Sequence, residues 1–224
     1  MEANAPLIQT REEAPLTIRR GHVSRRSLVL KRMFDVAAAL ILIFLLLPLW
    51  PVIGILIRLT SPGPIVFCQR RVGKRRRVFA MYKFRSMVEN AHSLRPHLRD
   101  LNEARGHLFK IKQDPRITAV GRWLRRYSLD ELPQLINVLR GDMTLVGPRP
   151  MPVEEVAYYA PWHHQRHSVT PGLTGLWQIN GRSDLSFDQM IALDFQYIEK
   201  CSLRMDLEIL SKTILVVLRG KGAY

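Results

Sequence analysis

An uncharged run of hydrophobic residues stands out near the start of the chain. It extends from Val36 to Ile57, and as one continuous helix it would measure about 33 Å, against a hydrocarbon core of about 30 Å. Pro48, Pro51 and Gly54 interrupt it, and a proline inside a helix removes one backbone hydrogen bond. The pattern predicts a membrane-embedded segment with a kink near Pro48.

Basic residues flank this apolar run on both sides. Lys31 and Arg32 precede it, and Arg58 opens a basic stretch that continues to Arg77. Because positive residues favour the cytoplasmic side, both flanks are expected there, and a helix–break–helix that enters one leaflet and returns satisfies both. The alternative is a kinked helix that crosses the bilayer once, since the charge rule weakens for long loops.

Beyond the apolar run, the periodicity changes to that of short strands and helices. The stretches PIVFCQRRVG and VFAMYKFRSM are rich in β-branched and aromatic residues and predict a strand pair. A helix is expected from Val88 to about Leu101. GRWLRRYSLDELPQLINVLRG predicts two short helices or one broken one. The last stretch, MDLEILSKTILVVLRGKGAY, predicts a helix in the core or at the membrane interface.

These elements predict an α/β-like, mostly helical cytoplasmic body with a short sheet. Interfacial amphipathic helices and a re-entrant membrane hairpin would anchor it. The expected divisions are a mobile basic tail at 1–30, the hairpin at 31–60 and a cytoplasmic domain at 61–224 with a C-terminal helix at the membrane interface. The tail has no apolar region of the signal-peptide kind.

Charge narrows the class of partner. The chain carries 34 Lys and Arg against 19 Asp and Glu, a formal charge of +15, which favours a polyanionic partner such as nucleic acid, anionic lipid or a phosphorylated small molecule. Cys68 and Cys201 have no disulfide or metal-ligand spacing, which suits a reducing compartment.

Two adjacent acids, Asp130 and Glu131, lie within an arginine-rich segment. Ser128 precedes them, and Ser-x-x-Glu is a capping box, so one interpretation is purely structural. In the same geometry a helix dipole and the arginines at 125 and 126 would favour ionised Asp130, which is competent as a nucleophile or as a magnesium ligand. Adjacent carboxylates with Mg²⁺ are suited to neutralising a diphosphate.

The basic residues around the acids favour chemistry. GPRP places Arg149 between two prolines that fix the backbone, which suits bidentate phosphate binding. Lys83 and Arg85 are two residues apart, so on a strand they would share one face. Together with the acids, these residues predict a site for a nucleotide diphosphate. Asp114 and Asp142 are assigned to turns.

Other interpretations are weighed beside this one. His163, His164 and His167 in WHHQRH raise the possibility of a zinc site, although an acid or cysteine in ligand spacing is missing. Trp177 and Gln178 fit either substrate contact or a packed turn. A membrane-tethered nucleic-acid binder needs stacking aromatics among its basic residues, and a lipid-binding scaffold needs neither acid.

The segment from Lys31 to Tyr224 resembles the bacterial sugar transferases, the monotopic polyprenyl-phosphate phosphoglycosyl transferases. The resemblance rests on KRMFD, SPGPIVFCQRRVG, KFRSM, SLDELPQLINVLRGDMTLVGPRP and TPGLTGLWQINGR, in that order. It implies a re-entrant helix broken at a proline, here Pro48, although Leu47 stands where some members carry serine. The ending RGKGAY resembles compact members that begin exopolysaccharide repeat units.

The resemblance also implies roles for single residues. Asp130 would attack the sugar-bearing phosphorus of a UDP-sugar, expel UMP and then pass the phosphosugar to undecaprenyl phosphate. Glu131 would hold Mg²⁺ with Asp130 or accept a proton. The basic residues expected near the phosphates or the nucleotide are Lys83, Arg85, Arg125, Arg149 and Arg182.

The implied setting is the cytoplasmic face of a bacterial inner membrane. The expected partners are a UDP-sugar, undecaprenyl phosphate, membrane lipids and downstream glycosyltransferases, with nucleic acid excluded. Glucose or galactose 1-phosphate is the expected group, with an N-acetylated sugar or a non-catalytic scaffold as the alternatives. The patterns neither require nor exclude a homodimer.

Overall fold

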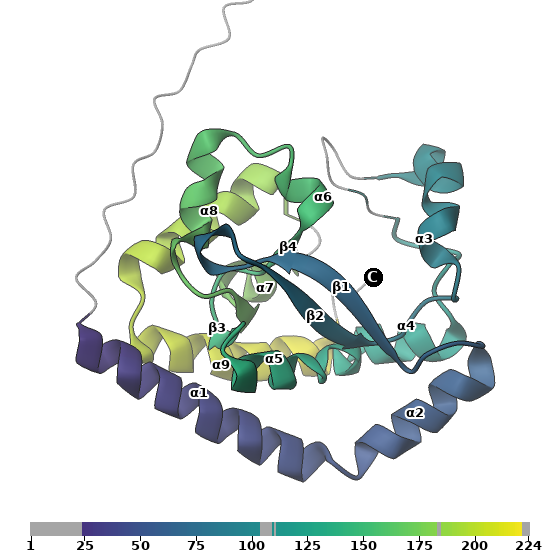
Figure 1. Ribbon diagram of the computed structural model, residues 1–224, viewed down its shortest axis with the longest axis horizontal. Coiled ribbons are helices and arrows are strands. Elements are labelled where there is room, and N and C mark those ends of the chain that lie inside the picture. Colours follow the sequence, from purple (N-terminus) through teal and green to yellow (C-terminus); the bar gives the residue numbers. More distant parts are fainter. Residues whose placement is uncertain (1–23, 104–108, 110, 183–184, 221–224) are drawn as a thin grey trace, which may run out of the picture.

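Two helices joined by a sharp bend run along the lower edge of the body (Figure 1). The computed structural model describes residues 24–103, 109, 111–182 and 185–220, and in it α1 (Arg25–Leu46) and α2 (Leu49–Thr60) meet at 64°. Pro48 is the N-cap of α2, where its missing N–H removes no helical hydrogen bond. The predicted break near Pro48 is therefore confirmed. No single helix in the described ranges is long and apolar enough to cross a bilayer, whereas the bent pair passes that test jointly.

The first helix begins earlier than the predicted start of the hairpin at residue 31. Ser24 is its N-cap, and the Ser24 side chain accepts a hydrogen bond from the main-chain N–H of Ser27 at 3.1 Å. Residues 25–30 are therefore helical, and the expected mobile tail is wrong for this part. The rest of that expectation, residues 1–23, lies outside the described residues.

The elements after the hairpin form a mostly helical body with two small sheets. Their order is β1 (Val66–Val72), η1 (Lys74–Arg76), β2 (Val78–Phe84), α3 (Ala91–Leu94), η2 (Arg95–Leu101), α4 (Ala119–Arg126), η3 (Leu129–Glu131), α5 (Gln134–Arg140), β3 (Thr144–Val146), β4 (Met151–Pro152), α6 (Val153–Val156), η4 (Pro161–Ser168), β5 (Gly172–Thr174), α7 (Leu176–Ile179), α8 (Phe187–Lys200) and α9 (Leu203–Arg219). Elements labelled η are 3₁₀ helices.

The predicted strand pair is confirmed. β1 and β2 are antiparallel from the pair Val66 and Phe84 to the pair Val72 and Val78, and β4 adds a short third strand in the order β2-β1-β4. β3 and β5 form a separate parallel pair. Buried Asn137 bonds the outer edge of β2, donating to the carbonyl of Ala80 at 2.7 Å and accepting from the N–H of Tyr82 at 3.0 Å. This contact fixes α5 against β2.

The segment from Val88 to Leu101 is not the single helix that was predicted. It contains the short helix α3 followed by the 3₁₀ helix η2, with a proline in the first turn of η2. The proline has no N–H to donate, so an α-helix cannot continue through it unbroken. By contrast, the expected pair of short helices between 121 and 141 is confirmed as α4 and α5, which η3 separates.

Polar contacts attach the hairpin to the body. Lys31 Nζ on α1 lies 2.6 Å from the Asp206 carboxylate on α9, and buried Asp35 accepts a short hydrogen bond from the Thr144 hydroxyl on β3. Arg32 donates to two carbonyls at the end of α5, at 2.6 and 2.9 Å. Helix α1 is thus bonded to α9, and also to β3 and α5, the two elements that lead directly to the candidate site.

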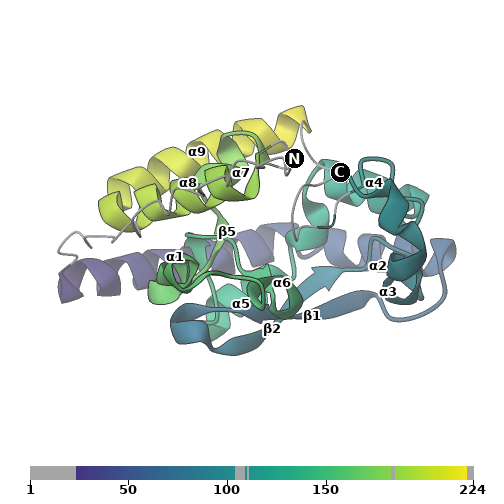
Figure 2. The ribbon, with the colours of Figure 1, turned by 90° about the horizontal axis from the view of Figure 1, so that it is seen from above.

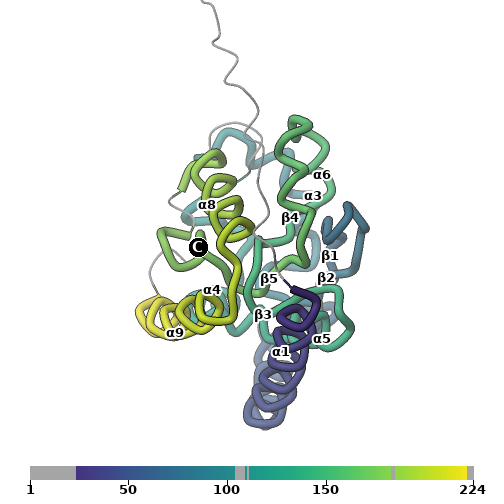
Figure 3. Tube along the Cα trace, turned by 90° about the vertical axis from the view of Figure 1, so that its left-hand side faces the viewer, coloured from purple at the N-terminus to yellow at the C-terminus, as the bar shows by residue number. Residues whose placement is uncertain are grey.

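The main hydrophobic core lies between the hairpin, β3 and the C-terminal helices. It joins residues that are distant in the chain, and Figures 2 and 3 show α8 and α9 beside one another on one flank. Its most buried members include Ala39, Leu135, Val138, Leu145, Val146, Ile191, Ile198 and Ile209. A second cluster, Ile53, Ile57, Phe84 and Leu124, packs α2 against β2 and α4. These two cores hold η3 between them.

Candidate active site

The acid pair lies on a single 3₁₀ turn rather than at the start of an α-helix. Ser128 precedes this turn in the left-handed conformation, with φ of 53°, and its side chain makes no capping hydrogen bond within the described residues. The capping-box interpretation is therefore wrong. A left-handed non-glycine residue costs about 1 to 3 kcal/mol and persists only where the surroundings enforce it. The strained residue lies two positions before Asp130, at the start of the turn that carries both acids.

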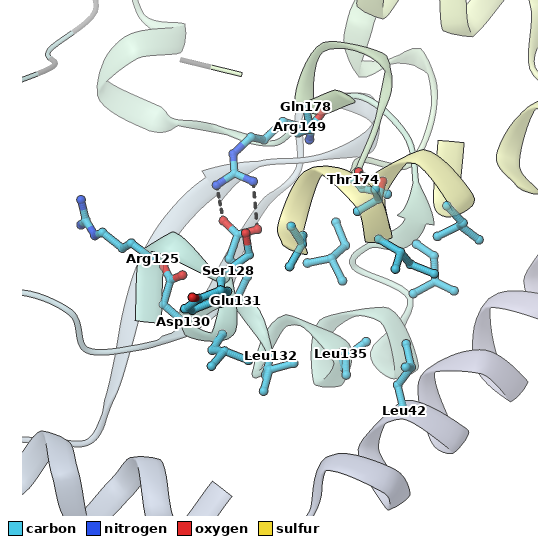
Figure 4. A pocket seen from close by; sticks show the side chains of 18 of the residues that line it. Leu42, Arg125, Ser128, Asp130, Glu131, Leu132, Leu135, Arg149, Thr174 and Gln178 are labelled. Atoms are coloured by element: carbon cyan, nitrogen blue, oxygen red, sulfur yellow. Dashed lines mark hydrogen bonds and ion pairs between the residues drawn. The ribbon is translucent and has the colours of Figure 1, made fainter. Parts of the chain in front are cut away.

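Glu131 is held between two cations from different parts of the chain. Its carboxylate accepts from Lys83 Nζ on β2 at 2.9 Å, and it forms a two-pronged pair with the Arg149 guanidinium, one prong of which measures 3.2 Å (Figure 4). Burial alone would raise the pKa of Glu131, but Arg149 and Lys83 lower that pKa far below its ordinary value. Glu131 is accordingly an ionised carboxylate whose oxygens are already bonded.

Asp130 differs from its neighbour in the sign of its pKa shift. Its side chain is 9% exposed, and its nearest cation is Lys83 Nζ at 3.8 Å. Burial raises the pKa of Asp130 above its ordinary value and outweighs the opposing charge of Lys83. The sequence led us to expect the opposite, because it assigned Asp130 to a helix N-terminus. Adjacent carboxylates whose pKa values are pushed apart are a usual basis for separate roles in catalysis.

Backbone packing fixes the loop that carries Arg149. The N–H of Gly147 donates to the carbonyl of Thr174 at 2.9 Å, and the N–H of Gly172 donates to the carbonyl of Pro148 at 2.8 Å. A Cβ atom at Gly172 would lie 2.1 Å from the nitrogen of Gly147, so only glycine allows this approach. The close contact places Arg149 opposite the acids.

Three further predicted residues have different outcomes. Arg125 and Arg182 line the same pocket as the acids. Arg125 donates from Nε to the Ser86 hydroxyl at 2.9 Å, and in Figure 4 its guanidinium extends away from Asp130. Arg85 does not line the pocket, because β2 ends at Phe84 and the buried Arg85 side chain instead donates to the carbonyl of Ser61 at 2.6 Å. The expectation that Arg85 binds phosphate is therefore not supported by its position.

The pocket has a volume of about 630 Å³ and two chemically different ends. One end gathers the acids with the cations Lys83, Arg125, Arg149 and Arg182. The other end is lined by aliphatic side chains and lies between α1 and α9. Leu132 and Leu135 are the aliphatic residues nearest to the acids (Figure 4). Trp177 and Gln178, for which substrate contact was one interpretation, also line this pocket. A volume of this size suits a small organic ligand.

Within the described residues, no group of three or more His, Cys, Asp or Glu side chains is arranged to hold a metal ion. The zinc interpretation of the three histidines is therefore not supported. Their rings instead pack around Tyr159, at centroid distances of 5.4 Å for His163, 5.8 Å for His164 and 6.1 Å for His167. The acid pair remains as a two-carboxylate donor set, which is enough for Mg²⁺ only when substrate phosphates complete the coordination.

Buried Arg166 and half-buried Arg71, two arginines near the site, were missed in the sequence. Arg166 donates to the carbonyl of Arg149, and Arg71 donates to the carbonyl of Pro150. Arg71 falls in a basic stretch that reads as a solvated surface, and Arg166 falls among the histidines. A signal that could have found Arg71 is the strand alternation, which turns it to the opposite face from exposed Arg70.

Comparison with known proteins places this geometry in context. A sequence model described as bacterial sugar transferase matches residues 26–220. The galactosyl transferase CpsE of Streptococcus agalactiae serotype III is 48% identical over 162 residues, which are 72% of this chain and 36% of that protein. The undecaprenyl-phosphate galactose phosphotransferase of Salmonella typhimurium is 43% identical over 214 residues, which are 93% of this chain and 44% of that protein.

A third relative has a length closer to that of this chain. The exopolysaccharide production protein ExoY of Sinorhizobium fredii is 40% identical over 198 residues, which are 87% of this chain and 88% of that protein. The chain spans less than half the length of the other two relatives. The match nevertheless runs from the first turn of α1 to the end of α9 and includes every residue of the pocket. The chain therefore belongs to the bacterial sugar transferase family.

Proposed function

We propose that the protein transfers a sugar 1-phosphate from a UDP-sugar to undecaprenyl phosphate and releases UMP. The observation that carries the proposal is the buried Asp130 beside Glu131 in a pocket that also contains four cationic side chains. A diphosphate brings negative charge that these cations can neutralise. The relatives named for galactose transfer support the same reaction class.

In the first step, an Asp130 carboxylate oxygen attacks the phosphorus that bears the sugar. The bond from this phosphorus to the UMP oxygen breaks, UMP leaves with the bonding electrons, and the phosphosugar stays on Asp130 as an acyl phosphate. Lys83, which lies 3.8 Å from Asp130, and Arg149 stabilise the charge that develops on the phosphoryl oxygens. No proton has to move in this step.

In the second step, a phosphate oxygen of undecaprenyl phosphate attacks the same phosphorus. The bond from phosphorus to Asp130 breaks, the free carboxylate is restored, and the product is a lipid diphosphate sugar. Glu131 keeps Lys83 and Arg149 at the reacting atoms, since it is bonded to both. With its pKa far below the ordinary range, Glu131 is a weak base, which favours this role over proton acceptance.

Magnesium is part of the proposal. Asp130 and Glu131 offer carboxylate oxygens, and Mg²⁺ is commonly bound by one or two carboxylates together with substrate phosphates. These two residues would hold the ion with the donor diphosphate, whose negative charge the ion would neutralise. Because the Glu131 oxygens are bonded to Lys83 and Arg149, we expect Mg²⁺ binding to require the donor.

The proposed location is the cytoplasmic face of the bacterial inner membrane, with the α1–α2 hairpin embedded in one leaflet. The bend of 64° and the bonds from Lys31 and Arg32 to the body support a re-entrant arrangement over a single crossing, because they tie the charged start of α1 to the catalytic part. This arrangement would keep the acids at headgroup depth, where a lipid phosphate lies. Membrane lipids would surround the hairpin.

A hexose, either glucose or galactose, is the proposed sugar, and the reaction would begin exopolysaccharide or other surface glycan synthesis. Downstream glycosyltransferases would extend the lipid-linked product. A donor with an N-acetylated sugar is the alternative within the same reaction. A non-catalytic scaffold that binds anionic lipid is the alternative from another class, and it has no need of a buried acid pair.

The test is UMP release from purified protein in detergent with Mg²⁺ and undecaprenyl phosphate. UDP-glucose, UDP-galactose and the N-acetylated donors are supplied separately. We expect release with one hexose donor and its loss in Asp130→Asn, while the matched surface variant Asp188→Asn keeps it, because Asp188 is exposed. Release that survives Asp130→Asn would refute the assigned nucleophile. The absence of release with every donor, from folded protein, would favour the scaffold.

A further inference from the structure

The hydrocarbon end of the pocket is a groove between the hairpin and the C-terminal helix. α1 contributes Leu42 and Leu46, and α9 contributes Leu210, Ile214 and Val217. Figure 4 shows Leu132, Leu135 and Leu42 following one another from the acid pair toward α1. The groove therefore starts at the reacting groups and leads away from them between two helices.

α1 and α9 contact each other outside the groove, which leaves the groove open between them. The ion pair of Lys31 with Asp206, at 2.6 Å, and the membership of Ala39 and Ile209 in the main core connect the two helices at positions that precede the lining residues in each helix. The lining residues lie farther along both helices, toward the break at Pro48 on α1 and toward the end of α9. Several are not sealed in the core, since Leu42 is 39% exposed and Ile214 is 62% exposed.

Thr213 is the polar side chain that α9 contributes to this lining, and its hydroxyl is already engaged in hydrogen bonds within the protein. Thr213 Oγ1 donates to the carbonyl of Ile209 at 2.7 Å and lies 2.8 Å from Thr174 Oγ1. The remaining α1 and α9 residues in the lining are aliphatic. A nucleotide or a sugar would lose hydrogen bonds to water here without replacing them, which disfavours its binding. A hydrocarbon chain has no hydrogen bonds to water to lose, and its burial here removes apolar surface from water, which is favourable.

The surroundings of the groove also match a lipid. Next to the lining residues, both helices expose aliphatic side chains as well, with Leu45 65% exposed and Leu218 69% exposed. The cations of the pocket lie at its other end, beside the acids. A ligand with one phosphate and one long hydrocarbon chain would satisfy both ends at once.

We propose that this groove binds the first isoprene units of the acceptor lipid, with the lipid phosphate directed to Asp130. The inference rests on the proposed function and adds to it where the acceptor lies. The donor would occupy the basic end and the acceptor chain the groove, so the acceptor phosphate oxygen meets the phosphosugar on Asp130 from the side of α1 and α9. The hairpin is then a wall of the acceptor site as well as an anchor.

The experiment fills the groove with a larger side chain from each wall. Leu46→Trp and Val217→Trp place an indole in the lining, and Leu45→Trp and Leu218→Trp place the same indole on the adjacent outward positions as matched controls. Two rates are measured for each variant. The first is the exchange of labelled UMP into UDP-sugar without acceptor, which reports only the donor step. The second is complete transfer to undecaprenyl phosphate.

We expect Leu46→Trp and Val217→Trp to keep the exchange rate and to lose about tenfold or more in kcat/KM for undecaprenyl phosphate. The outward controls should keep both rates. Complete transfer that is unchanged in both groove variants would overturn the inference. Loss of exchange in the groove variants would also count against it, because the groove would then serve the donor or the fold of the acid site.

Failure of the proposed function has a separate signature, which is the absence of UMP exchange in the unaltered protein with every donor. A prenyl phosphate of short chain length adds a second arm. Undecaprenyl phosphate should be preferred over the short acceptor by the unaltered protein, and the groove variants should lose part of that preference. An unchanged preference in both groove variants would place the chain outside the groove.

Discussion

Arg166 donates a hydrogen bond from Nη2 to the main-chain carbonyl of Arg149 at 2.8 Å. The donor is itself fixed, since Arg166 is 4% exposed, pairs closely with Asp194 and donates to the Tyr159 hydroxyl at 2.6 Å. The result is that an arginine on η4 holds the backbone of the arginine that holds Glu131. Arg166 does not line the pocket, so its effect on the reaction would pass through Arg149.

The same loop is held at two neighbouring carbonyls. Arg71 on β1 donates from Nη1 to the carbonyl of Pro150 at 2.9 Å, and the N–H of Gly172 donates to the carbonyl of Pro148 at 2.8 Å. Three successive carbonyls therefore meet donors from η4, β1 and β5. Because prolines have no N–H, two of these three residues can be hydrogen-bonded only through their carbonyls. Arg71 and Arg166 thus act as positioning residues for the Arg149 guanidinium.

The variant Arg166→Met should weaken both folding and donor binding. It leaves the Asp194 charge buried and unpaired, which costs about 3 to 5 kcal/mol of unfolding free energy. The double variant Arg166→Met/Asp194→Leu removes both charges and should recover most of that stability. The carbonyl of Arg149 still lacks its donor, so KM for the UDP-sugar should stay raised by about tenfold. Thermal unfolding and initial rates measure the two effects, and a double variant with normal KM would show that Arg166 is only structural.

The variant Arg71→Met tests the second contact. Burial, with the charge of Arg149, lowers the pKa of Arg71 to about 10, so this guanidinium remains protonated at neutral pH. Its loss leaves the carbonyl of Pro150 without a charged donor, which costs about 1 to 3 kcal/mol, and donor KM should rise by about tenfold. Arg70→Met is the matched control, because Arg70 is exposed on the neighbouring position of β1. Equal kinetics in the two variants would contradict the positioning role.

Local patterns were enough to predict several elements. The strand pair, the break near Pro48 and the two short helices at α4 and α5 follow from short-range signals, whereas the placement of Arg125 and Arg182 beside the acids was implied by the family resemblance. A proline breaks a helix and β-branched runs form strands whatever their distant neighbours are. The family resemblance supplied the order of the motifs that brought the basic residues to one pocket.

Long-range packing decided what the patterns could not. Ser128 and Glu131 have capping-box spacing, yet Glu131 is drawn to Lys83 and Arg149, which lie far away in sequence. The pKa direction of Asp130 depends on burial between two cores, and burial is not visible in a charge-rich segment. The buried role of Arg166 is likewise set by Asp194 on α8, which no motif connects to it.

The two acids should respond oppositely when their charge is removed. Burial raises the pKa of Asp130, so its ionised form at neutral pH costs stability, and Asp130→Asn should raise Tm while abolishing transfer. Arg149 and Lys83 lower the pKa of Glu131 below its ordinary value, so its charge contributes stability above the unfolded-state pKa and loses it in acid. Glu131→Gln should therefore cost about 1 to 3 kcal/mol and lower Tm. Thermal unfolding curves at neutral pH measure both Tm changes, and Tm changes of the same sign in the two variants would contradict the opposite pKa directions assigned to the two acids.

A buried histidine on η4 should make stability depend on pH. His167 is 6% exposed and stacks on Tyr159, and burial, followed by the charges of Arg166, His164 and Arg76, lowers the pKa of His167 to about 3. A lowered folded-state pKa means that the unfolded chain binds the proton more readily. His167 therefore contributes stability that is fully present above its ordinary pKa of about 6.5 and is lost as pH falls toward 3.

Asp194 acts in the opposite direction nearby, because burial raises its pKa to about 6 and the folded state takes up its proton first. The contribution of His167 is therefore best isolated by comparison with a variant. His167→Phe keeps a flat ring against Tyr159 and removes the titration. Tm should therefore fall less between about pH 7.5 and about pH 5 than in the unaltered protein. There, the His167 contribution to the free energy of unfolding falls by up to about 1.4 kcal/mol per pH unit. His92→Phe, at an exposed position on α3, should leave the fall unchanged. An equal fall in His167→Phe would mean that His167 does not resist protonation in the fold.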